Sequence, residues 1–180
     1  AAIRILLPLL PALTASSPIA DGKRTNFLDT RLVYYKTNQK RLPALGGAVI
    51  PESVASEAEY EREIFKPIDR EIAPYNKDNI LNRSFLNSRG AIARFDRGSV
   101  EIRLVDVQEC PRADIAFLSL IVQTIAWLVE QGMDTTKALQ QWSTQTLVEI
   151  LDGTIKTGGN FVILDKSYPT IFGLPRGTTR

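Results

Sequence analysis

Alternating apolar and polar positions dominate residues 90–111 and predict a β-hairpin, with a break at residues 96–99. A two-residue loop at residues 97–98 gives one apolar face with three cross-strand pairs: Phe95 and Val100, Ala93 and Ile102, and Ala91 and Leu104. Because side chains alternate across a strand, the other face carries Arg94 opposite Glu101, with Arg103 two residues further on. This face would hold two guanidinium groups and a carboxylate within about 7 Å of one another. The alternative interpretation is a cross-strand ion pair on a solvated sheet face.

Apolar residues at helical spacing predict helices on both sides of this hairpin. The expected helices cover residues 3–14, 27–41, 56–73, 111–131 and 134–152. Pro8 and Pro11 should kink the first helix, which is apolar enough to be buried. Ser56 and Glu59 fit a capping box at the start of the third helix, and Pro67 should kink or end it.

The two helices after the hairpin carry the strongest apolar signal in the chain. Pro111 begins the first of them, which we expect to be buried nearly all round, with Trp127 in the core. Asp134 should cap the second helix and Gly153 should end it. The apolar run at residues 161–164 predicts one short strand between loops.

Composition limits the classes of function. A chain of 180 residues with 44% hydrophobic content can form one substantial core, and a net charge of +2 gives no electrostatic case for nucleic acid. The single cysteine, Cys110, suits a reducing cytoplasm. The absence of histidine excludes a Ser-His-Asp triad, a Cys-His pair and imidazole-ligated metal within these residues. Sites built from carboxylate oxygens, which Mg²⁺ prefers, remain open.

The N-terminal stretch has three interpretations. With a basic residue, an apolar run and small residues, it resembles a signal peptide, but the run is too short and too interrupted by proline for a membrane span. The third interpretation, a buried helix of a protein that starts further upstream, is favoured because Met133 is the only methionine. We therefore expect a missing N-terminal portion and no membrane partner.

Two segments offer candidate ligand contacts before any family is considered. The loop at residues 15–26 contains Ser16-Ser17-Pro18, which can present hydroxyl and backbone N–H groups. In the helix that follows, Arg31, Tyr34 and Tyr35 are candidate contacts. The alternative for these three is a surface arginine beside half-buried aromatic rings.

The segment Val100-Glu101-Ile102-Arg103-Leu104-Val105-Asp106, followed by a Pro-led helix with Ala116-Phe117-Leu118, resembles a known strand motif. It is the Glu-x-Arg strand of the glutamine synthetase and glutamate–cysteine ligase superfamily. Within that superfamily the chain resembles the second glutamate–cysteine ligase family, the carboxylate–amine ligases. Its leading segment LLPLLPALTASSPIADGKRT resembles that family's helix and Ser-Ser-Pro loop, and residues 28–43 resemble the following Arg-bearing helix.

The resemblance implies an α+β fold, with a glutamine synthetase-like antiparallel sheet around residues 91–107 packed with several helices. It implies that residues 1–180 are the C-terminal portion of one ligase catalytic domain, with residues 44–84 as a variable insertion and 154–180 as a tail. It also implies an ATP-dependent, cytoplasmic ligase. ATP would phosphorylate the γ-carboxylate of glutamate or a similar acid, and an amine such as cysteine would attack the acyl phosphate.

Roles for individual residues follow from the same resemblance. Glu101 would be a catalytic residue and Mg²⁺ ligand, and Arg103 would bind phosphate or substrate carboxylate as charge develops. Arg31 resembles the arginine that meets substrate in the helix after the Ser-Ser-Pro loop. From the hairpin, loop and helix patterns described above, we also expect Arg94, Ser16, Ser17 and Tyr35 to contact ATP or substrate. Carboxylates next to arginines stay ionised, as a magnesium ligand must, and phosphoryl transfer needs cations around the transferring group.

The chain departs from the family pattern in one important respect. The family's N-terminal strand, whose clustered glutamates hold further metal ions, is not among these residues. We therefore expect this chain alone to be inactive, with the rest of the site in the missing N-terminal part or another chain. The competing classes are a degenerate scaffold for protein contacts and an anion-binding domain without turnover. Assembly into a homo-oligomer is left open by the apolar helices.

Overall fold

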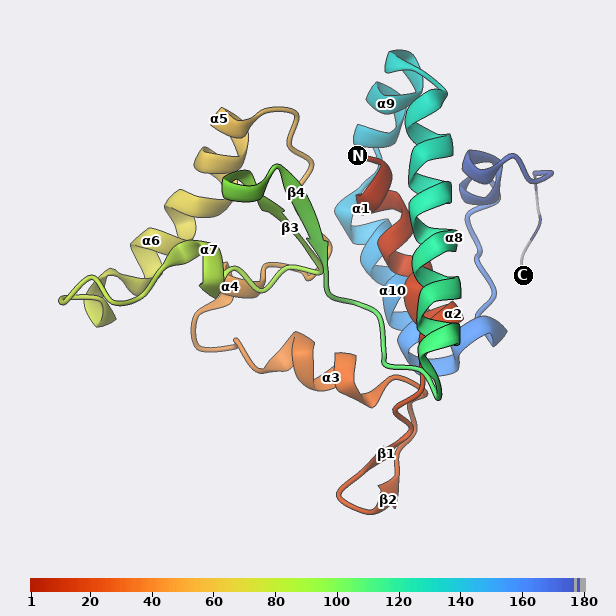
Figure 1. The fold of residues 1–180 in the computed structure, drawn as a ribbon, viewed down its shortest axis with the longest axis horizontal. Helices are drawn as coiled ribbons and strands as arrows, with labels where there is room; N and C mark the ends of the chain where they lie inside the picture. The colour runs from red at the N-terminus through yellow and green to blue at the C-terminus, as the bar shows by residue number, and fades with distance from the viewer. Residues whose placement is uncertain (177, 179–180) are drawn as a thin grey trace.

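A computed structural model describes residues 1–176 and 178, and it places a small β-hairpin between two groups of helices (Figure 1). The α-helices are α1 (Ala2–Leu6), α2 (Leu10–Thr14), α3 (Thr30–Thr37), α4 (Pro43–Gly46), α5 (Glu57–Tyr60), α6 (Lys66–Ile72), α7 (Arg83–Leu86), α8 (Pro111–Glu130), α9 (Met133–Gln140) and α10 (Thr144–Thr157). The strands are β1 (Ile19–Ala20), β2 (Lys23–Arg24), β3 (Ala91–Arg94) and β4 (Ser99–Ile102). They form two antiparallel pairs, β1 with β2 and β3 with β4. The α+β class is confirmed, whereas the glutamine synthetase-like arrangement stays a prediction.

The predicted kinked helix at the N-terminus is confirmed. A 3₁₀ turn at Leu7–Leu9 separates α1 from α2, as expected where Pro8 and Pro11 remove backbone donors. Ile5, which is fully buried, belongs to the larger of two apolar clusters. This helix packs against α8 and α10 and anchors the right-hand group in Figure 1.

The hairpin forms, but its predicted register is wrong by two residues. Ala91 lies opposite Ile102 and Arg94 lies opposite Ser99, so that Glu101 faces Ile92. The turn has four residues, a 3₁₀ segment at Phe95–Arg97 and then Gly98 with φ of 59°, instead of a two-residue loop. Because the shift is an even number of residues, every side chain keeps its predicted face.

The buried Arg89 fixes the chain just before β3. Its guanidinium forms two hydrogen bonds with Glu52, from Nε at 2.5 Å and from Nη2 at 2.6 Å. Nη1 donates to the Ala44 carbonyl at 3.1 Å. This paired contact attaches the loop between α4 and α5 to the start of the hairpin.

The helix predicted from residue 56 is present in a modified form. Ser56 Oγ accepts a hydrogen bond from the Glu59 backbone N–H at 3.2 Å, while Glu59 reaches back to the Ala55 N–H at 2.7 Å. A π-helical segment at Glu61–Phe65 precedes Pro67, and the helix continues through the proline to the end of α6. The π segment lets the helix accommodate the missing proline N–H instead of ending there.

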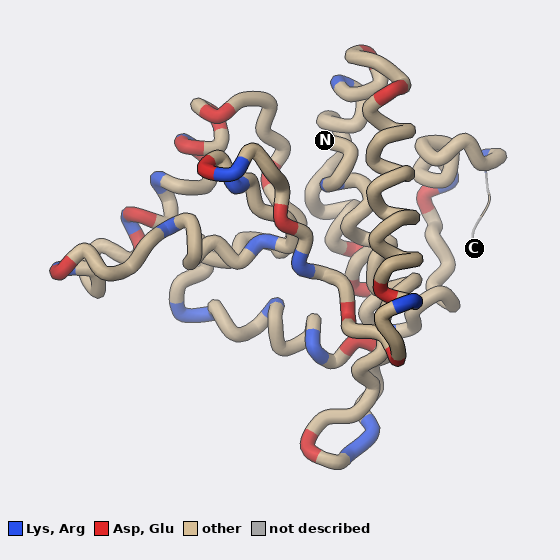
Figure 2. Tube along the Cα trace, in the orientation of Figure 1, with Lys and Arg blue, Asp and Glu red and all other residues tan. Residues whose placement is uncertain are grey.

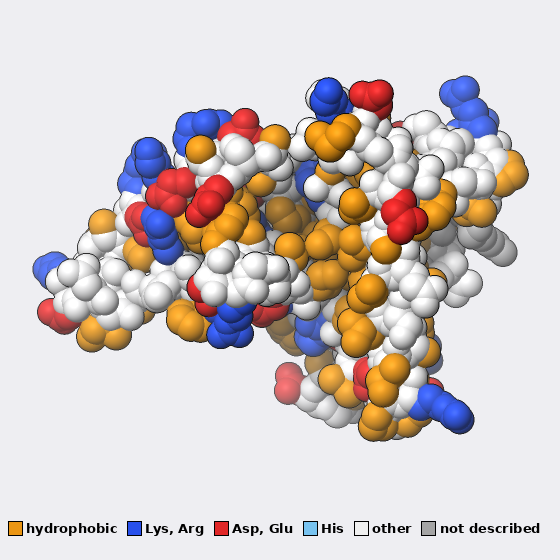
Figure 3. All heavy atoms as spheres, turned by 45° about the horizontal axis from the view of Figure 1, so that its top comes forward, with side chains coloured by type: hydrophobic (Ala, Val, Ile, Leu, Met, Phe, Trp, Pro, Cys, Tyr) orange, Lys and Arg blue, Asp and Glu red, His pale blue; other side chains and the backbone are white. Residues whose placement is uncertain are grey.

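Helix α8 has the predicted start at Pro111, but the predicted burial nearly all round is wrong. Only Ile121 and Leu128 are buried, and Trp127, predicted to be core, is 39% exposed. The other exposed apolar side chains of α8 are Ile115, Leu118, Leu120, Val122 and Val129. Figure 3 shows apolar side chains gathered along this helix. Apolar spacing identifies surface that favours burial, but it does not show whether these 180 residues supply the partner that buries it.

By length and composition alone, α8 is also apolar enough to cross a membrane. A single helix of this kind is weak evidence, because core helices of soluble proteins pass the same test. Charged residues lie at its two ends, and its length between them is almost free of charge (Figure 2).

The region after α8 differs from the prediction at three points. The single helix predicted from Asp134 is two helices, α9 and α10, and Asp134 lies in the first turn behind an N-cap at Gly132. Helix α10 runs through Gly153 and ends at Gly158, where φ is 58°. Residues 161–164 form no strand. Residues 177 and 179–180 of the predicted tail lie outside the described part of the chain.

Gly153 lies inside α10 beside an aromatic ring that leaves no room for a side chain. A Cβ atom built at this position would overlap the ring of Phe161. We therefore expect Gly153→Ala to lower the free energy of unfolding by about 1–3 kcal/mol, measured by urea denaturation. Gly46→Ala is the control, since its Cβ would lie 3.7 Å from the nearest side-chain atom. Equal stability of the two variants would contradict the predicted overlap.

Candidate functional site

Three charged side chains meet on one face of the hairpin, and we call them the arginine–glutamate cluster: Arg94, Glu101 and Arg103. Arg103 Nε donates to Glu101 Oε1 at 2.7 Å, and Arg94 Nη1 lies 3.4 Å from Oε2. Arg103 Nη1 also donates to the Asn87 carbonyl at 2.8 Å. The structure thus brings together the three residues that alternation placed on one face, although Arg94 reaches Glu101 diagonally.

The cluster keeps its carboxylate charged. The hydrogen bond from Arg103 is the largest effect that lowers the pKa of Glu101 below its usual value, and Arg94 adds to it. Burial works against the charge of Arg103, but hydrogen bonds to Glu101 and Tyr35 leave its pKa above the usual value. The Glu101 side chain remains 42% exposed, so its carboxylate can still be reached by a ligand.

A second cluster, the serine–aspartate cluster, consists of Ser16, Ser17, Arg31 and Asp106. The carboxylate of Asp106, a residue that is 3% exposed, accepts hydrogen bonds from the Ser16 backbone N–H at 2.9 Å and from Ser17 Oγ at 2.7 Å. It also forms an ion pair with Arg31 Nε. Asp106 therefore holds the Ser-Ser-Pro loop and the start of α3 against the chain that leaves β4.

Arg31 connects the two clusters. Its Nη1 donates to the backbone carbonyl of Arg103 at 3.2 Å. Among the described residues its buried Nη2 has no hydrogen-bond partner, and neither does the buried Oδ2 of the adjacent Asp29. Burial raises the pKa of Asp29, whose other oxygen caps α3. Buried donors without a partner are exceptional in folded proteins, and this one marks Arg31 as a candidate functional residue.

The remaining predicted contacts divide into two groups. Tyr35 lies at the site, because its hydroxyl donates to the Arg89 carbonyl at 3.4 Å and it neighbours Arg103. Tyr34 is 58% exposed, and its hydroxyl forms no hydrogen bond with either cluster among the described residues. Asp106 was not a candidate in the sequence, although its place between the Glu-x-Arg strand and the Pro-led helix could have indicated it.

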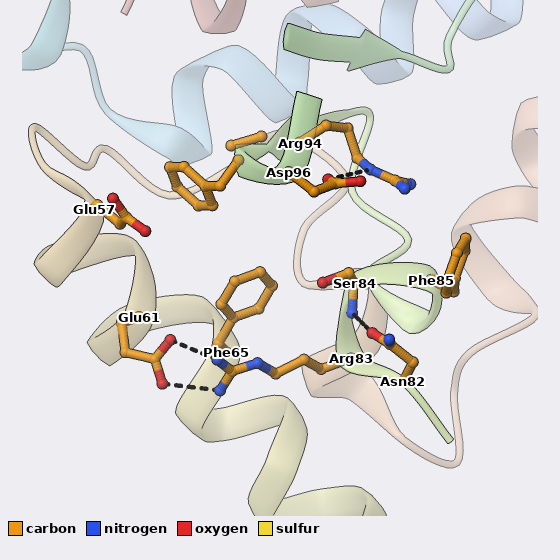
Figure 4. A pocket seen from close by; sticks show the side chains of 11 residues that line it. Glu57, Glu61, Phe65, Asn82, Arg83, Ser84, Phe85, Arg94 and Asp96 are labelled. Atoms are coloured by element: carbon orange, nitrogen blue, oxygen red, sulfur yellow. Dashed lines mark hydrogen bonds and ion pairs between the residues drawn. The ribbon is translucent and has the colours of Figure 1, made fainter. Parts of the chain in front are cut away.

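A cleft of about 340 Å³ lies on the other side of Arg94, and we call it the hairpin cleft. Glu57 and Glu61 come from the α5 side, Arg83 and Phe85 come from α7, and Arg94 comes from β3. Figure 4 shows the Phe65 ring between Glu61 and the hairpin, and Arg94 extending toward Phe85. Sequence patterns do not indicate this cleft, because the charged residues after Ser56 are typical of the solvated face of a helix.

The described residues do not fit a magnesium site on their own. They contain no group of three or more Asp, Glu or Cys side chains placed to hold a metal ion. Glu101 supplies one carboxylate, and both of its oxygens already face arginine. Oxygen ligands from other polypeptide would be needed to complete such a site.

Comparison with known proteins agrees with the sequence motifs. The family model described as glutamate–cysteine ligase family 2 matches residues 1–154, which include both clusters and the hairpin cleft. An uncharacterized protein of Archaeoglobus fulgidus is 35% identical over 156 residues, covering 87% of this chain. The match covers 39% of that protein, so the chain spans about two fifths of its length. No solved structure matches.

Proposed function

Because the chain belongs to the glutamate–cysteine ligase family 2, we propose that it is part of an ATP-dependent ligase that joins a carboxylic acid to an amine. In the proposed reaction, a carboxylate oxygen of the acid attacks the γ-phosphorus of ATP, and ADP leaves. The amine nitrogen then attacks the carbonyl carbon of the acyl phosphate, the bond from carbon to the phosphate oxygen breaks, and inorganic phosphate and one proton are released. A glutamate-like acid is the proposed first substrate.

One observation carries this proposal: Arg31 joins the serine–aspartate cluster to Arg103 and has an open donor. We assign Arg31 and Arg103 to the anionic oxygens of the acid or of the transferring phosphoryl group. Such transfer depends mainly on positioning and on fixed positive charge, which two anchored arginines supply. Ser16 and Ser17 hold the loop beside this position through Asp106, and Tyr35 supports Arg103.

Glu101 has two proposed tasks. It orients Arg103 through their hydrogen bond, and it is one candidate ligand for the Mg²⁺ that accompanies ATP. Since this chain alone does not fit a metal site, the proposal places the other carboxylates in polypeptide outside these 180 residues. No chemical step is assigned to the metal.

The test is an assay of phosphate release from Mg·ATP by a protein that contains this chain and the remaining polypeptide of a full-length ligase. We expect release only when both a glutamate-like acid and an amine are present, with one amide formed for each phosphate. The 180-residue chain alone serves as the comparison and should give no release. Phosphate release that is independent of the acid would contradict the proposed reaction.

A second candidate is an anion-binding domain without turnover. It is favoured by the anchored arginines Arg31 and Arg103, which can hold an anion, and by the lack of a group of carboxylates for a metal ion among the described residues. In that case calorimetry would detect binding of ATP or glutamate, while the full-length protein would form no amide.

A further inference from the structure

Among the described charged groups that line the hairpin cleft, one carboxylate has no positively charged partner. Arg83 is occupied by Glu61, at 2.8 and 2.9 Å, and by Asp69 at 2.7 Å. On the opposite wall, Arg94 lies 3.4 Å from Asp96. Glu57 forms no ion pair or side-chain hydrogen bond within the part of the chain that the structure describes. The cleft therefore has unmatched negative charge.

The aromatic side chains of the cleft also favour positive charge. Arg83 lies over the Phe65 ring at 4.4 Å, and Arg94 lies over the Phe85 ring at 5.1 Å. The Phe95 ring has no such cation among the described residues. Phe85 and Phe95 are 65% and 45% exposed, which leaves apolar ring surface that a ligand can cover. Ring faces attract cations, and their area favours an apolar body.

We propose that the hairpin cleft binds the amine substrate, and that this substrate carries an ammonium group on a flat or apolar body. Glu57 receives the ammonium group, and the ring of Phe95, whose face no described cation covers, contacts the body. The assignment of the hairpin cleft as a substrate site rests on the proposed ligase function. A ligand with a net negative charge is disfavoured, because it would meet Glu57 while both arginines are already paired.

Arg94 places this cleft next to the arginine–glutamate cluster. The same guanidinium lies 3.4 Å from Asp96 on the cleft side and 3.4 Å from Glu101 on the cluster side. An amine held in the cleft is therefore separated by one side chain from the carboxylate that orients Arg103. The cleft thus takes up the second substrate next to the proposed site of acyl phosphate formation, and its nitrogen leaves Glu57 and loses a proton before it attacks the acyl phosphate.

The binding test uses three probes that share a phenyl ring: phenethylamine, 2-phenylethanol and phenylacetate. Dissociation constants are measured by NMR titration of the full-length protein without ATP. We expect phenethylamine to bind most tightly, and Glu57→Gln or Phe95→Leu to weaken it by about 5-fold each, the size of an exposed ion pair or cation–π contact. Glu130→Gln and Tyr75→Leu are matched controls at exposed positions outside the cleft and should bind as the unmodified protein does. Equal affinity for the three probes, or unchanged affinity of Glu57→Gln, would overturn the proposal.

Steady-state kinetics then separate the cleft from the ligase reaction. We expect Glu57→Gln to raise KM for the amine and to leave KM for ATP and for the acid unchanged. If amide formation is observed but the amine KM is unaffected by both cleft variants, the cleft assignment is wrong and the ligase function stands. If phenethylamine binds in the cleft but no amide forms, the ligase function fails and with it the role of the cleft as a substrate site.

Discussion

Replacing Glu101 by glutamine is expected to reduce ATP-dependent phosphate release by about 100-fold or more, the size seen when one preorganised electrostatic contact is removed from an active site. The glutamine side chain has nearly the same shape but lacks the charge that attracts Arg94 and Arg103. Arg103 would then lose its fixed orientation, and a metal ion would lose a candidate ligand. The measurement is the initial rate with saturating Mg·ATP, acid and amine.

The matched control for this substitution is Glu130→Gln at the exposed end of α8. It removes the same charge from the chain and should leave the rate unchanged. Circular dichroism and urea unfolding of both variants check that the fold is intact. A Glu101→Gln rate within a factor of about 2 of the control would remove Glu101 from the proposed catalytic residues.

Asp106→Ala is expected to have the largest effect on stability, a loss of about 2–4 kcal/mol in the free energy of unfolding. The substitution leaves the Ser16 N–H, the Ser17 hydroxyl and Arg31 Nε without their acceptor. Arg31 is partly exposed, so water can compensate some of this loss. Urea denaturation measures the change in stability. Ligase kinetics should show a higher KM for the acid, because Arg31 is no longer held in place.

Asp78→Ala is the control for this experiment, because Asp78 is exposed and lies far from the cluster in sequence. Its stability should stay within about 0.5 kcal/mol of the unmodified protein. If Asp106→Ala unfolds at the same urea concentration as this control, Asp106 does not hold the Ser-Ser-Pro loop in place. A conservative variant, Asp106→Asn, should recover part of the stability, since its carbonyl can accept one of the lost hydrogen bonds.

Features with local causes could be predicted from the sequence. Pro8 and Pro11 kink the first helix, Pro111 begins α8, and alternation puts Glu101 on the same hairpin face as Arg94. Each of these results depends on backbone donors or side-chain alternation over a few residues.

Features that depend on distant partners could not be predicted. Helix α10 continues past Gly153, which packs against the ring of Phe161, and nothing near Gly153 in the sequence indicates that contact. The burial expected for Trp127 needed a neighbour that the described residues do not supply. The predicted hairpin register is wrong because the turn after Arg94, a 3₁₀ segment followed by Gly98, has four residues instead of two.

The candidate site shows the same division. The resemblance to the family indicated Arg31 and Glu101, but the acceptor that links the serine loop to Arg31 is Asp106, which lies 75 residues beyond it in the chain. The hairpin cleft could not be predicted because Glu57, Phe85 and Arg94 line one cleft only when the chain between them folds back against the hairpin. Its charges look like those of a solvated helix when they are considered alone.

The two apolar clusters lie on either side of the hairpin and differ in size. The smaller one contains Leu45, Tyr60, Ile64, Phe65, Ile68 and Ile72, and the larger one includes the buried faces of α1, α2 and α10. A small cluster gives its segment less protection against local opening. Backbone amides around α5 and α6 should therefore exchange with solvent hydrogen faster than those of α10. The α5 wall of the hairpin cleft is therefore expected to open locally more often than α10 does.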